Sequence, residues 1–420
     1  MARIVVTSFG SSGDLNPFLA LGLGLRARGH DVLFAVEERF HQILMLAGFT
    51  THHLTGDIET ALAATGRRMF GRLTPFPSVR TFVDQYILPT LRPKVMELLD
   101  ACADAALLVA AAGQLSASFV ADLTGIPWVT VALTPGTIPS AYLDPQPLPL
   151  SLPVTIQPLV NRVAWDIGAF ALRRIADTPV NRVRDEYGLP HRGNLLLAGN
   201  LSRRLTAVAA SPAFQPRPPD WPRFVRMTGF CFWDTPDLWR APDDLEAFLA
   251  RPEPVIAVSS GSVAPGVTQA FTEFYRTSLS AIQRVGARAL VIGAAAGTFH
   301  DPLPDDALAL PFAPFSQVYS HCTAVIHHGG IGTVAQALRA GVPALVIPWG
   351  VDQYINAEQV AHLGAGRWLQ RHSYTVERAV QGLDALLHRE RYREQAQALA
   401  TQIVQEDGVA TLCDALESVL

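Results

Sequence analysis

Short apolar runs, rich in β-branched residues, recur along the chain, and most are followed by a glycine or polar turn. The first third of the chain holds four such runs, at 4–9, 31–36, 106–111 and 127–133. Their length and composition are typical of buried strands. Between the first two, Asn16 and Pro17 indicate a helix start and Gly29 a helix end. Strand, glycine turn, helix and strand in this order predict a βαβ unit.

The pattern then breaks and starts again. A proline-rich apolar stretch at 134–153 precedes a helical segment at about 155–187, and a second proline-rich passage at 211–224 is interpreted as a linker. Beyond it come five further apolar runs, at 254–262, 289–294, 307–312, 323–328 and 343–348. The repetition predicts an α/β protein with two doubly wound domains.

Composition narrows the possible functions. Of the 420 residues, 49% are hydrophobic and 17% charged, and the net charge of −4 comes without a long basic run, which argues against nucleic acid as a partner. Lys94 is the only lysine, a bias that indicates a GC-rich bacterial genome. The four cysteines lie far apart and predict neither disulfides nor a metal site. With no signal peptide and no apolar run of about 18 residues, we expect a cytoplasmic protein with at most peripheral membrane contact.

The stretch HHGGIGT, residues 327–333, lies where a strand is predicted to end and a helix to begin. The first turn of a helix has unpaired N–H groups and a positive dipole end, which suit a phosphate. Gly330 and Gly332 let the backbone approach such a group, and His328 and Thr333 add donors. A tight turn with incidental histidines remains the alternative.

Two neighbouring segments carry further polar and aromatic groups. Trp349, Asp352 and Gln353 follow the next predicted strand, at the strand end where α/β proteins bind ligands. A carboxylate beside a carboxamide can both accept from and donate to sugar hydroxyls, although a solvated loop gives the same pattern. Phe312 follows another strand and could stack on a base or belong to the core.

The order FAPF, HHGGIGT, RAGVP, DQ across Phe312 to Gln359 resembles the donor-binding signature of GT-B glycosyltransferases of the UDP-glycosyltransferase type. The closest likeness is to bacterial members acting on antibiotics, sterols or other lipophilic alcohols and to rhamnosyltransferases. The resemblance implies two Rossmann-like domains facing across a cleft. It also implies that the nucleotide sugar contacts Gly261, Ser262, Phe312, His328, Gly330, Gly332, Thr333, Gln336, Trp349, Asp352 and Gln353.

Within this resemblance each group has an expected role. His328 contacts the β-phosphate, Thr333 and the turn at Gly261 and Ser262 hold phosphate, and the DQ pair holds the sugar. Plant relatives have tryptophan in place of Phe312 and glutamate, which binds ribose, in place of Gln336. Phenylalanine still stacks on a pyrimidine and glutamine still binds a hydroxyl, so the donor is expected to be a UDP-sugar or a dTDP-sugar. Positive charge from His328 and the helix start would take the place of a metal.

The first domain is expected to hold the acceptor and the catalytic base. GSSGDLNPF, residues 10–18, resembles the family's first glycine loop, in which plant members carry histidine in place of Asp14. A carboxylate there can take the proton from an acceptor hydroxyl. A helix N-terminal acid is the structural alternative. Gly13, His52 and His53 are weaker candidates for the rim of the acceptor site, although a solvated loop explains the two histidines equally well.

These features together predict an inverting, metal-independent hexosyltransferase with Asp14 as base and no cofactor beyond the nucleotide sugar. Apolar stretches at 76–91 and 134–153 favour a lipophilic small-molecule acceptor. We expect an acceptor domain at 1–222, a linker at 223–253, a donor domain at 254–402, and a final helix at 403–420 that returns to the first domain. The sequence determines neither the acceptor nor the oligomeric state.

Two alternatives belong to other functional classes. A nucleotide-sugar epimerase shares the two-domain layout, but the DQ pair and the proline-rich region argue against it. A non-catalytic nucleotide-sugar-binding partner protein is the second, and the joint presence of Asp14, His328 and Asp352 argues against that reading.

Overall fold

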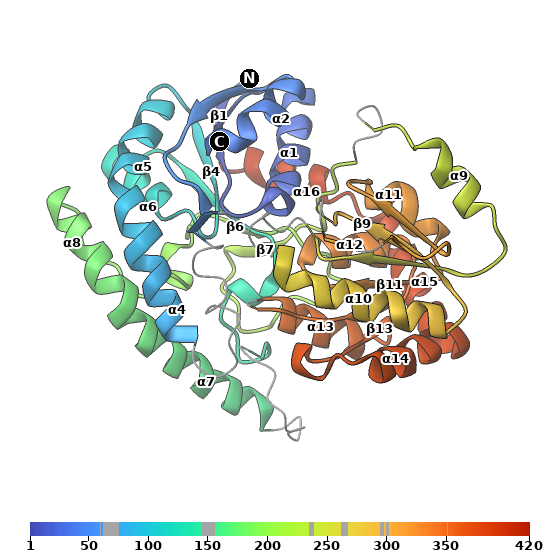
Figure 1. The fold of residues 1–420 in the computed structure, drawn as a ribbon. Helices are drawn as coiled ribbons and strands as arrows, with labels where there is room; N and C mark the ends of the chain where they lie inside the picture. The colour runs from blue at the N-terminus through green and yellow to red at the C-terminus, as the bar shows by residue number, and fades with distance from the viewer. Residues whose placement is uncertain are drawn as a thin grey trace. The chain divides into compact units, whose positions relative to one another are not determined.

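The chain forms two compact units in the computed structural model, which describes every residue except 59, 62–74, 145–155, 235–238, 262–267, 295–297, 300–301 and 351. Unit 1 comprises Met1–Trp233 together with Asp407–Leu420, and unit 2 comprises Asp234–Glu406 (Figure 1). Each unit is a parallel sheet with its own helices, so the predicted α/β class with two doubly wound domains is confirmed.

Unit 1 is built on a seven-stranded parallel sheet with the order β3-β2-β1-β4-β5-β6-β7. Its strands are β1 (Arg3–Thr7), β2 (Asp31–Val36), β3 (Thr50–His53), β4 (Leu107–Ala111), β5 (Trp128–Ala132), β6 (Thr206–Val208) and β7 (Val225–Met227). The strand order reverses between β1 and β4, and in such sheets ligands bind at the carboxyl end of the strands beside that reversal.

The helices of unit 1 are α1 (Ser12–Ala27), α2 (His41–Leu46), α4 (Pro75–Phe82), α5 (Leu88–Ala101), α6 (Leu115–Thr124), α7 (Gln157–Leu172), α8 (Thr178–Glu186) and α16 (Gly408–Glu417). Wider π-helical turns, Val83–Ile87 and Arg173–Asp177, join α4 to α5 and α7 to α8. Short 3₁₀ turns lie at Glu38–Phe40, Pro135–Thr137 and Ala198–Asn200. Helix α16 packs on α1, where Leu412 and Leu416 join the same buried cluster as Leu15 and Leu19.

Unit 2 repeats the plan with six parallel strands in the order β10-β9-β8-β11-β12-β13. They are β8 (Val255–Ser259), β9 (Arg288–Ile292), β10 (Ala307–Leu310), β11 (Ala324–His327), β12 (Ala344–Val346) and β13 (Gly366–Trp368). The helices are α9 (Asp243–Leu249), α10 (Thr268–Arg284), α11 (Phe315–Val318), α12 (Ile331–Arg339), α13 (Asp352–His362), α14 (Val376–His388) and α15 (Glu390–Gln405), with 3₁₀ turns at Tyr319–His321 and Arg371–Ser373. Here the order reverses between β8 and β11.

Two expectations about local structure were wrong. The passage at 211–224 is not a linker, because it joins β6 to β7 inside unit 1 and buries Phe214 and Trp221. A high proline content predicts that a segment forms neither helix nor strand. It does not distinguish a loop inside one domain from a linker between two domains. Helix α1 begins at Ser12 rather than at Asn16, and Pro17 lies inside it.

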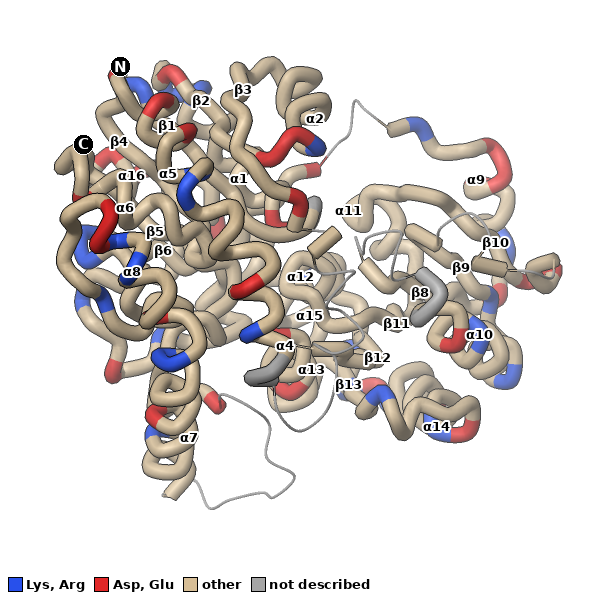
Figure 2. The backbone as a smooth tube through the Cα atoms, turned by 60° about the vertical axis from the view of Figure 1, so that its left-hand side comes forward, with Lys and Arg blue, Asp and Glu red and all other residues tan. Residues whose placement is uncertain are grey.

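Charged residues of both signs are interspersed over the helices of each unit (Figure 2). The strands of both sheets are mostly buried apolar residues. Among the described residues, no helix combines the length and the apolar character that crossing a bilayer requires.

Candidate functional site

Three loops of unit 2 meet at the carboxyl edge of its sheet, beside the reversal of strand order. They follow β8, β11 and β12, which are adjacent, with His327 paired to Ser259 on one side and to Val346 on the other. The loop after β8 contains Gly261, the loop after β11 is the HHGG turn, and the loop after β12 leads to Asp352. The fold therefore brings the three predicted donor-binding segments to one edge, except that Ser262 lies outside the described residues.

His328 packs between two glycines. A Cβ atom on Gly261 would lie 2.2 Å from Cε1 of His328, and one on Gly330 would lie 2.5 Å from its Nε2. The ring is 8% exposed, and its buried Nδ1 has no hydrogen-bond partner among the described residues. Burial lowers the pKa of His328 to about 4. Burial thus disfavours the charged imidazole, so His328 offers neutral hydrogen bonds, and its positive charge beside a bound diphosphate stays a prediction.

Helix α12 starts directly after this turn, and its first turn is open beside Gly332. Gly330 is its N-cap, and glycine has no side chain that could accept a hydrogen bond from the first turn. A Cβ atom on Gly332 would meet no atom within 4 Å, whereas Thr333 is buried. Backbone N–H groups at a helix start that is open at Gly332 are chemically suited to an anion.

Asp352 is tied to the glycine turn through Asn356, which was not predicted from the sequence, whereas Gln353 bonds to its own loop. Asn356 donates from Nδ2 to the carbonyl of Gly329 at 3.0 Å and to Oδ2 of Asp352 at 3.1 Å. Gln353 accepts the N–H groups of Trp349 and Gly350 at 2.8 and 3.2 Å. The position of Asn356, one helical turn after Asp352, was the available signal.

The two aromatic candidates differ in burial. Phe312 is 59% exposed, so the alternative that it belongs to the core is wrong. Its ring is available to stack on a planar group. Trp349 is 4% exposed, with the Phe271 ring centroid 4.0 Å away and the Arg371 guanidinium 3.8 Å from its own centroid. Its indole belongs to the packing beneath the site.

Gln336 lies in a small polar group near the chain entry to unit 2. Arg339 donates to Oε1 of Gln336 at 3.0 Å and to Asp234 at 2.7 Å. Burial pushes the pKa of Asp234 upward, but hydrogen bonds from Arg339, Ser316 and Gln336 outweigh it and hold that pKa below its ordinary value. Asp234 thus places a carboxylate next to Gln336, which the sequence alone did not indicate.

In unit 1, Asp14 lies in the first turn of α1, next to the strand reversal. Its Oδ2 accepts the N–H of Ser11 at 2.6 Å and the Ser11 hydroxyl at 2.9 Å. Burial raises the pKa of the Asp14 carboxyl above its ordinary value, while the bonds from Ser11 and the charge of Arg39 act in the opposite direction. A raised pKa suits a general base, and the bonds to Ser11 also cap the helix. Gly13 is the next residue before it in the same turn.

His52 and His53 end β3, the edge strand of the sheet. His52 lies 3.8 Å from Asp100, and His53 lies 3.3 Å from Glu38. These carboxylates account for both imidazoles without an acceptor, which favours the reading of the two histidines as solvated residues.

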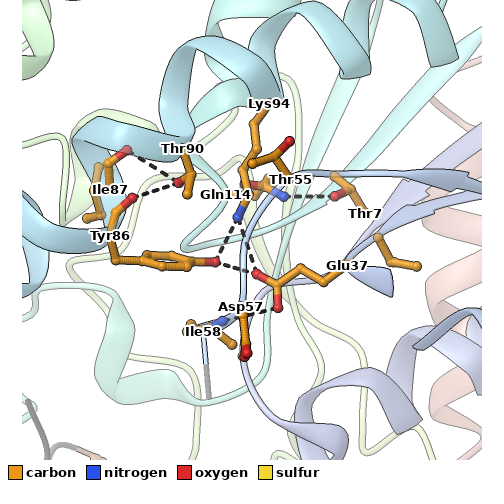
Figure 3. A network of polar contacts seen from close by, with 12 residues as sticks. Thr7, Glu37, Thr55, Asp57, Ile58, Tyr86, Ile87, Thr90, Lys94 and Gln114 are labelled. Carbon is orange, nitrogen blue, oxygen red and sulfur yellow. Dashed lines mark hydrogen bonds and ion pairs between the residues drawn. The ribbon is translucent and has the colours of Figure 1, made fainter. Parts of the chain in front are cut away.

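A buried polar network that the sequence reasoning missed lies at the same carboxyl edge of unit 1 (Figure 3). Glu37, directly after β2, accepts the hydroxyl of Tyr86 and the N–H of Ile58, the latter at 3.2 Å. Lys94 donates to Glu37 at 3.4 Å and to the Tyr86 hydroxyl at 2.7 Å. Burial lowers the pKa of Lys94. The lone lysine of the chain was noted in the sequence, but only as a compositional bias.

Comparisons with known proteins match both units. The glycosyltransferase family 28 N-terminal domain matches residues 4–143, and the erythromycin biosynthesis protein CIII-like C-terminal domain matches 277–418. The chain is 32% identical over 378 residues to O-mycaminosyltylonolide 6-deoxyallosyltransferase of Streptomyces fradiae, covering 86% of this chain and 84% of that protein. It is 27% identical to sterol 3-beta-glucosyltransferase of Aspergillus terreus, over 99% of this chain but 30% of that longer protein.

A solved structure, the glycotransferase of kitacinnamycin, superposes with a TM-score of 0.74 at 20% identity, over 100% of this chain and 99% of that one. The two doubly wound units of the chain form the GT-B fold. The chain belongs to the GT-B glycosyltransferases of the UDP-glycosyltransferase type. It is an enzyme, a hexosyltransferase, rather than an epimerase or a non-catalytic partner protein.

The packing of His328 against Gly261 predicts a strong effect of one methyl group. Gly261 has a φ of +77°, so Gly261→Ala combines backbone strain of roughly 1–2 kcal/mol with displacement of the His328 ring. Gly286→Ala is the matched control, because its φ is +70° and its Cβ would meet nothing within 4 Å. We expect both variants to melt earlier, but only Gly261→Ala to weaken UDP binding, by roughly tenfold or more. Equal UDP affinities in calorimetry would contradict this packing role.

The neutral histidines predict an acid-sensitive unit 2. His327 and His328 have pKa values lowered by burial to about 3 and about 4. Because the unfolded chain protonates near pH 6.5 and the folded protein does not, stability is lost as pH falls below that value. At pH 5 the loss from His328 is about 2 kcal/mol. Urea unfolding at pH 7.5 and 5.0 measures the drop in the free energy of unfolding between the two pH values. In His328→Gln this drop should be smaller than in the wild type by about 2 kcal/mol. An equal drop in both proteins would contradict the prediction.

Proposed function

We propose that the enzyme transfers a hexose, with inversion and without a metal, from a UDP- or dTDP-sugar to a hydroxyl of a lipophilic small molecule. Its four cysteines are free thiols in the structure, which favours the reducing cytoplasm as its location. The nucleotide sugar is the only co-substrate in this proposal.

The observation that carries the proposal is the edge of unit 2 at the strand reversal. There the start of helix α12, the Gly330–Gly332 turn and the His328 ring, which packs against Gly261 and Gly330, lie together. A diphosphate has oxygens that accept from all of these donors, and neutral donors at a helix start stabilise a departing dianion as a metal would. Asp352, tied to the same turn through Asn356, and Gln353 on the adjacent loop supply acceptors and donors for sugar hydroxyls.

The chemistry assigned to unit 1 is proton removal. The carboxylate of Asp14 takes the proton as the acceptor oxygen forms its bond to the anomeric carbon. The bond from that carbon to the diphosphate breaks, and its electron pair leaves with the nucleoside diphosphate. One displacement inverts the anomeric configuration.

The names of the relatives support a lipophilic acceptor, since one is named for a sterol and the other for O-mycaminosyltylonolide. The apolar segment at 76–91 is described, but 145–153 of the second predicted segment lies outside the described residues. A panel of apolar and charged alcohols, with UDP-glucose and dTDP-rhamnose as donors, tests this assignment. Turnover confined to highly charged acceptors would contradict it.

The donor site is tested by His328→Ala. We expect nucleotide binding to weaken by about 1.5–3 kcal/mol, the usual contribution of a hydrogen bond to a charged group. Calorimetry with UDP and with dTDP measures this directly. His321→Ala, which removes an exposed imidazole of the same unit, is the control and should bind both nucleotides as the wild type does. Unchanged affinity of His328→Ala for both nucleotides would remove His328 from the pyrophosphate site.

A further inference from the structure

Arg39 connects the buried network of unit 1 to the loop that carries Asp14. It lies in the short turn Glu38–Phe40, and its guanidinium donates to the carbonyl oxygen of Gly10. Its Nε lies 3.3 Å from Oε2 of Glu37. Its guanidinium carbon also lies 4.2 Å from the centroid of the Phe40 ring. One side chain therefore joins a buried carboxylate to the glycine loop.

The carbonyl that Arg39 binds belongs to the residue against which Asp14 packs. Gly10 has a φ of +126°, and a Cβ atom there would lie 2.3 Å from Oδ2 of Asp14. The carboxylate thus lies directly over Gly10, and any movement of this residue changes the place of Asp14. Ser11, the next residue, donates both its N–H and its hydroxyl to the same oxygen.

Arg39 is itself fixed from the interior. Its partner Glu37 is 8% exposed and is held by Tyr86, by Lys94 and by the backbone of Ile58 (Figure 3). A Cβ atom on Gly56 would lie 3.1 Å from each of Glu37, Lys94 and Tyr86, so the backbone closes tightly over the group. Any displacement of the Glu37 carboxylate would break its hydrogen bonds to Tyr86, Lys94 and Ile58 together, so Glu37 is a fixed partner for Arg39.

We propose that Arg39 is a positioning residue for the transfer reaction: held by Glu37, it anchors the glycine loop at Gly10 and places a fixed positive charge beside the carboxylate of Asp14. This inference rests on the proposed role of Asp14 as base. Buried anchors of this kind hold catalytic groups within narrow limits, and small displacements of such groups are costly to turnover.

The charge has a direction of effect that can be measured. Two groups act on the Asp14 carboxyl: the donors of Ser11, at the start of its own helix, and the guanidinium of Arg39, in the turn after β2. Within the described residues, Arg39 is the charged group that affects its pKa. Loss of this positive charge removes a stabilising partner of the carboxylate and raises the pKa of Asp14. The acidic limb of the pH profile of kcat then moves to higher pH.

Two variants separate charge from geometry. Arg39→Met removes both, and we expect kcat at the optimum to fall roughly tenfold and the acidic limb to move up by about one pH unit. Arg39→Lys keeps the positive charge but loses the planar guanidinium and its fixed donor geometry. The acidic limb of the pH profile should therefore stay in place, while kcat should fall by less than in Arg39→Met. UDP affinity, a property of unit 2, should not change in either variant.

Arg26→Met is the matched control. Arg26 also donates to backbone carbonyls of a glycine turn in unit 1, those of Ala47 and Gly48 at 3.0 and 2.9 Å, and among the described residues it makes no hydrogen bond to the Asp14 loop. It should lower the melting temperature without moving the pH profile. If Arg39→Met behaves like Arg26→Met, Arg39 is structural only and the inference is overturned.

The experiment uses the acceptor that gives the highest turnover in the screen, with Asp14→Asn measured in parallel. An inactive Asp14→Asn with an unmoved profile in Arg39→Met overturns the inference alone. An active Asp14→Asn overturns the proposed base, and the inference falls with it. An inactive Asp14→Asn with a moved profile supports both.

Discussion

Asp14→Asn should lower kcat by roughly 10²–10⁴, the usual contribution of a positioned general base. Asparagine keeps the shape of the side chain and an oxygen that accepts the N–H of Ser11, but it cannot take a proton. Burial already raises the pKa of Asp14, which moves it toward the working pH of a base. Turnover at saturating acceptor and donor measures the effect.

The same residue caps α1, so its structural role must be measured separately. Loss of an N-terminal cap costs about 0.5–2 kcal/mol, and the amide retains part of that bond. We therefore expect the melting temperature to change little and UDP affinity to stay the same, because the proposed phosphate site is in unit 2. Turnover within threefold of wild type would leave Asp14 as a helix cap and would require another base.

Glu37→Ala should destabilise the protein by about 3–5 kcal/mol, because it removes one partner of a buried ion pair and leaves the other without compensation. Lys94 is 5% exposed and loses its carboxylate partner, while Tyr86 and the N–H of Ile58 lose their acceptor. Urea unfolding monitored on unit 1 measures this free energy. Replacing both charges, as in Glu37→Leu with Lys94→Met, should recover part of the loss.

Glu38→Ala provides the comparison from the adjacent position. The Glu38 side chain is 76% exposed, and its partners are His53 at 3.3 Å and His41 at 3.7 Å, so its removal should cost about 1 kcal/mol or less. A loss for Glu37→Ala no larger than that for Glu38→Ala would show that the network in Figure 3 does not hold unit 1 together.

The sequence was sufficient for those parts of the molecule that rest on local patterns. Apolar runs bounded by glycine predicted nine strands and both doubly wound units, and the HHGGIGT stretch predicted the helix start at α12. The short strands β3, β6, β7 and β13 were missed, because segments of three or four residues carry little periodicity and owe their conformation to neighbouring strands.

The parts of the site that escaped prediction depend on contacts between distant residues. Glu37 and Lys94 are separated by 57 positions, and Asp234 and Arg339 by 105. No local pattern marks such pairs. The lowered pKa of His328 was also not predicted, since it follows from burial between Gly261 and Gly330 rather than from the residue type.

Helix α16 has a consequence for the order in which the enzyme can be made. Its residues Val409 and Cys413 fit against Gly24 of α1, where a Cβ atom would lie 2.6 and 3.0 Å from them, so unit 1 lacks part of its core until α16 has been synthesised. At about 5–20 residues per second, a ribosome needs roughly 9–35 seconds for the intervening 234–406. During that interval the apolar surface of α1 is uncovered on the nascent chain, whereas unit 2 has its whole sequence in one piece.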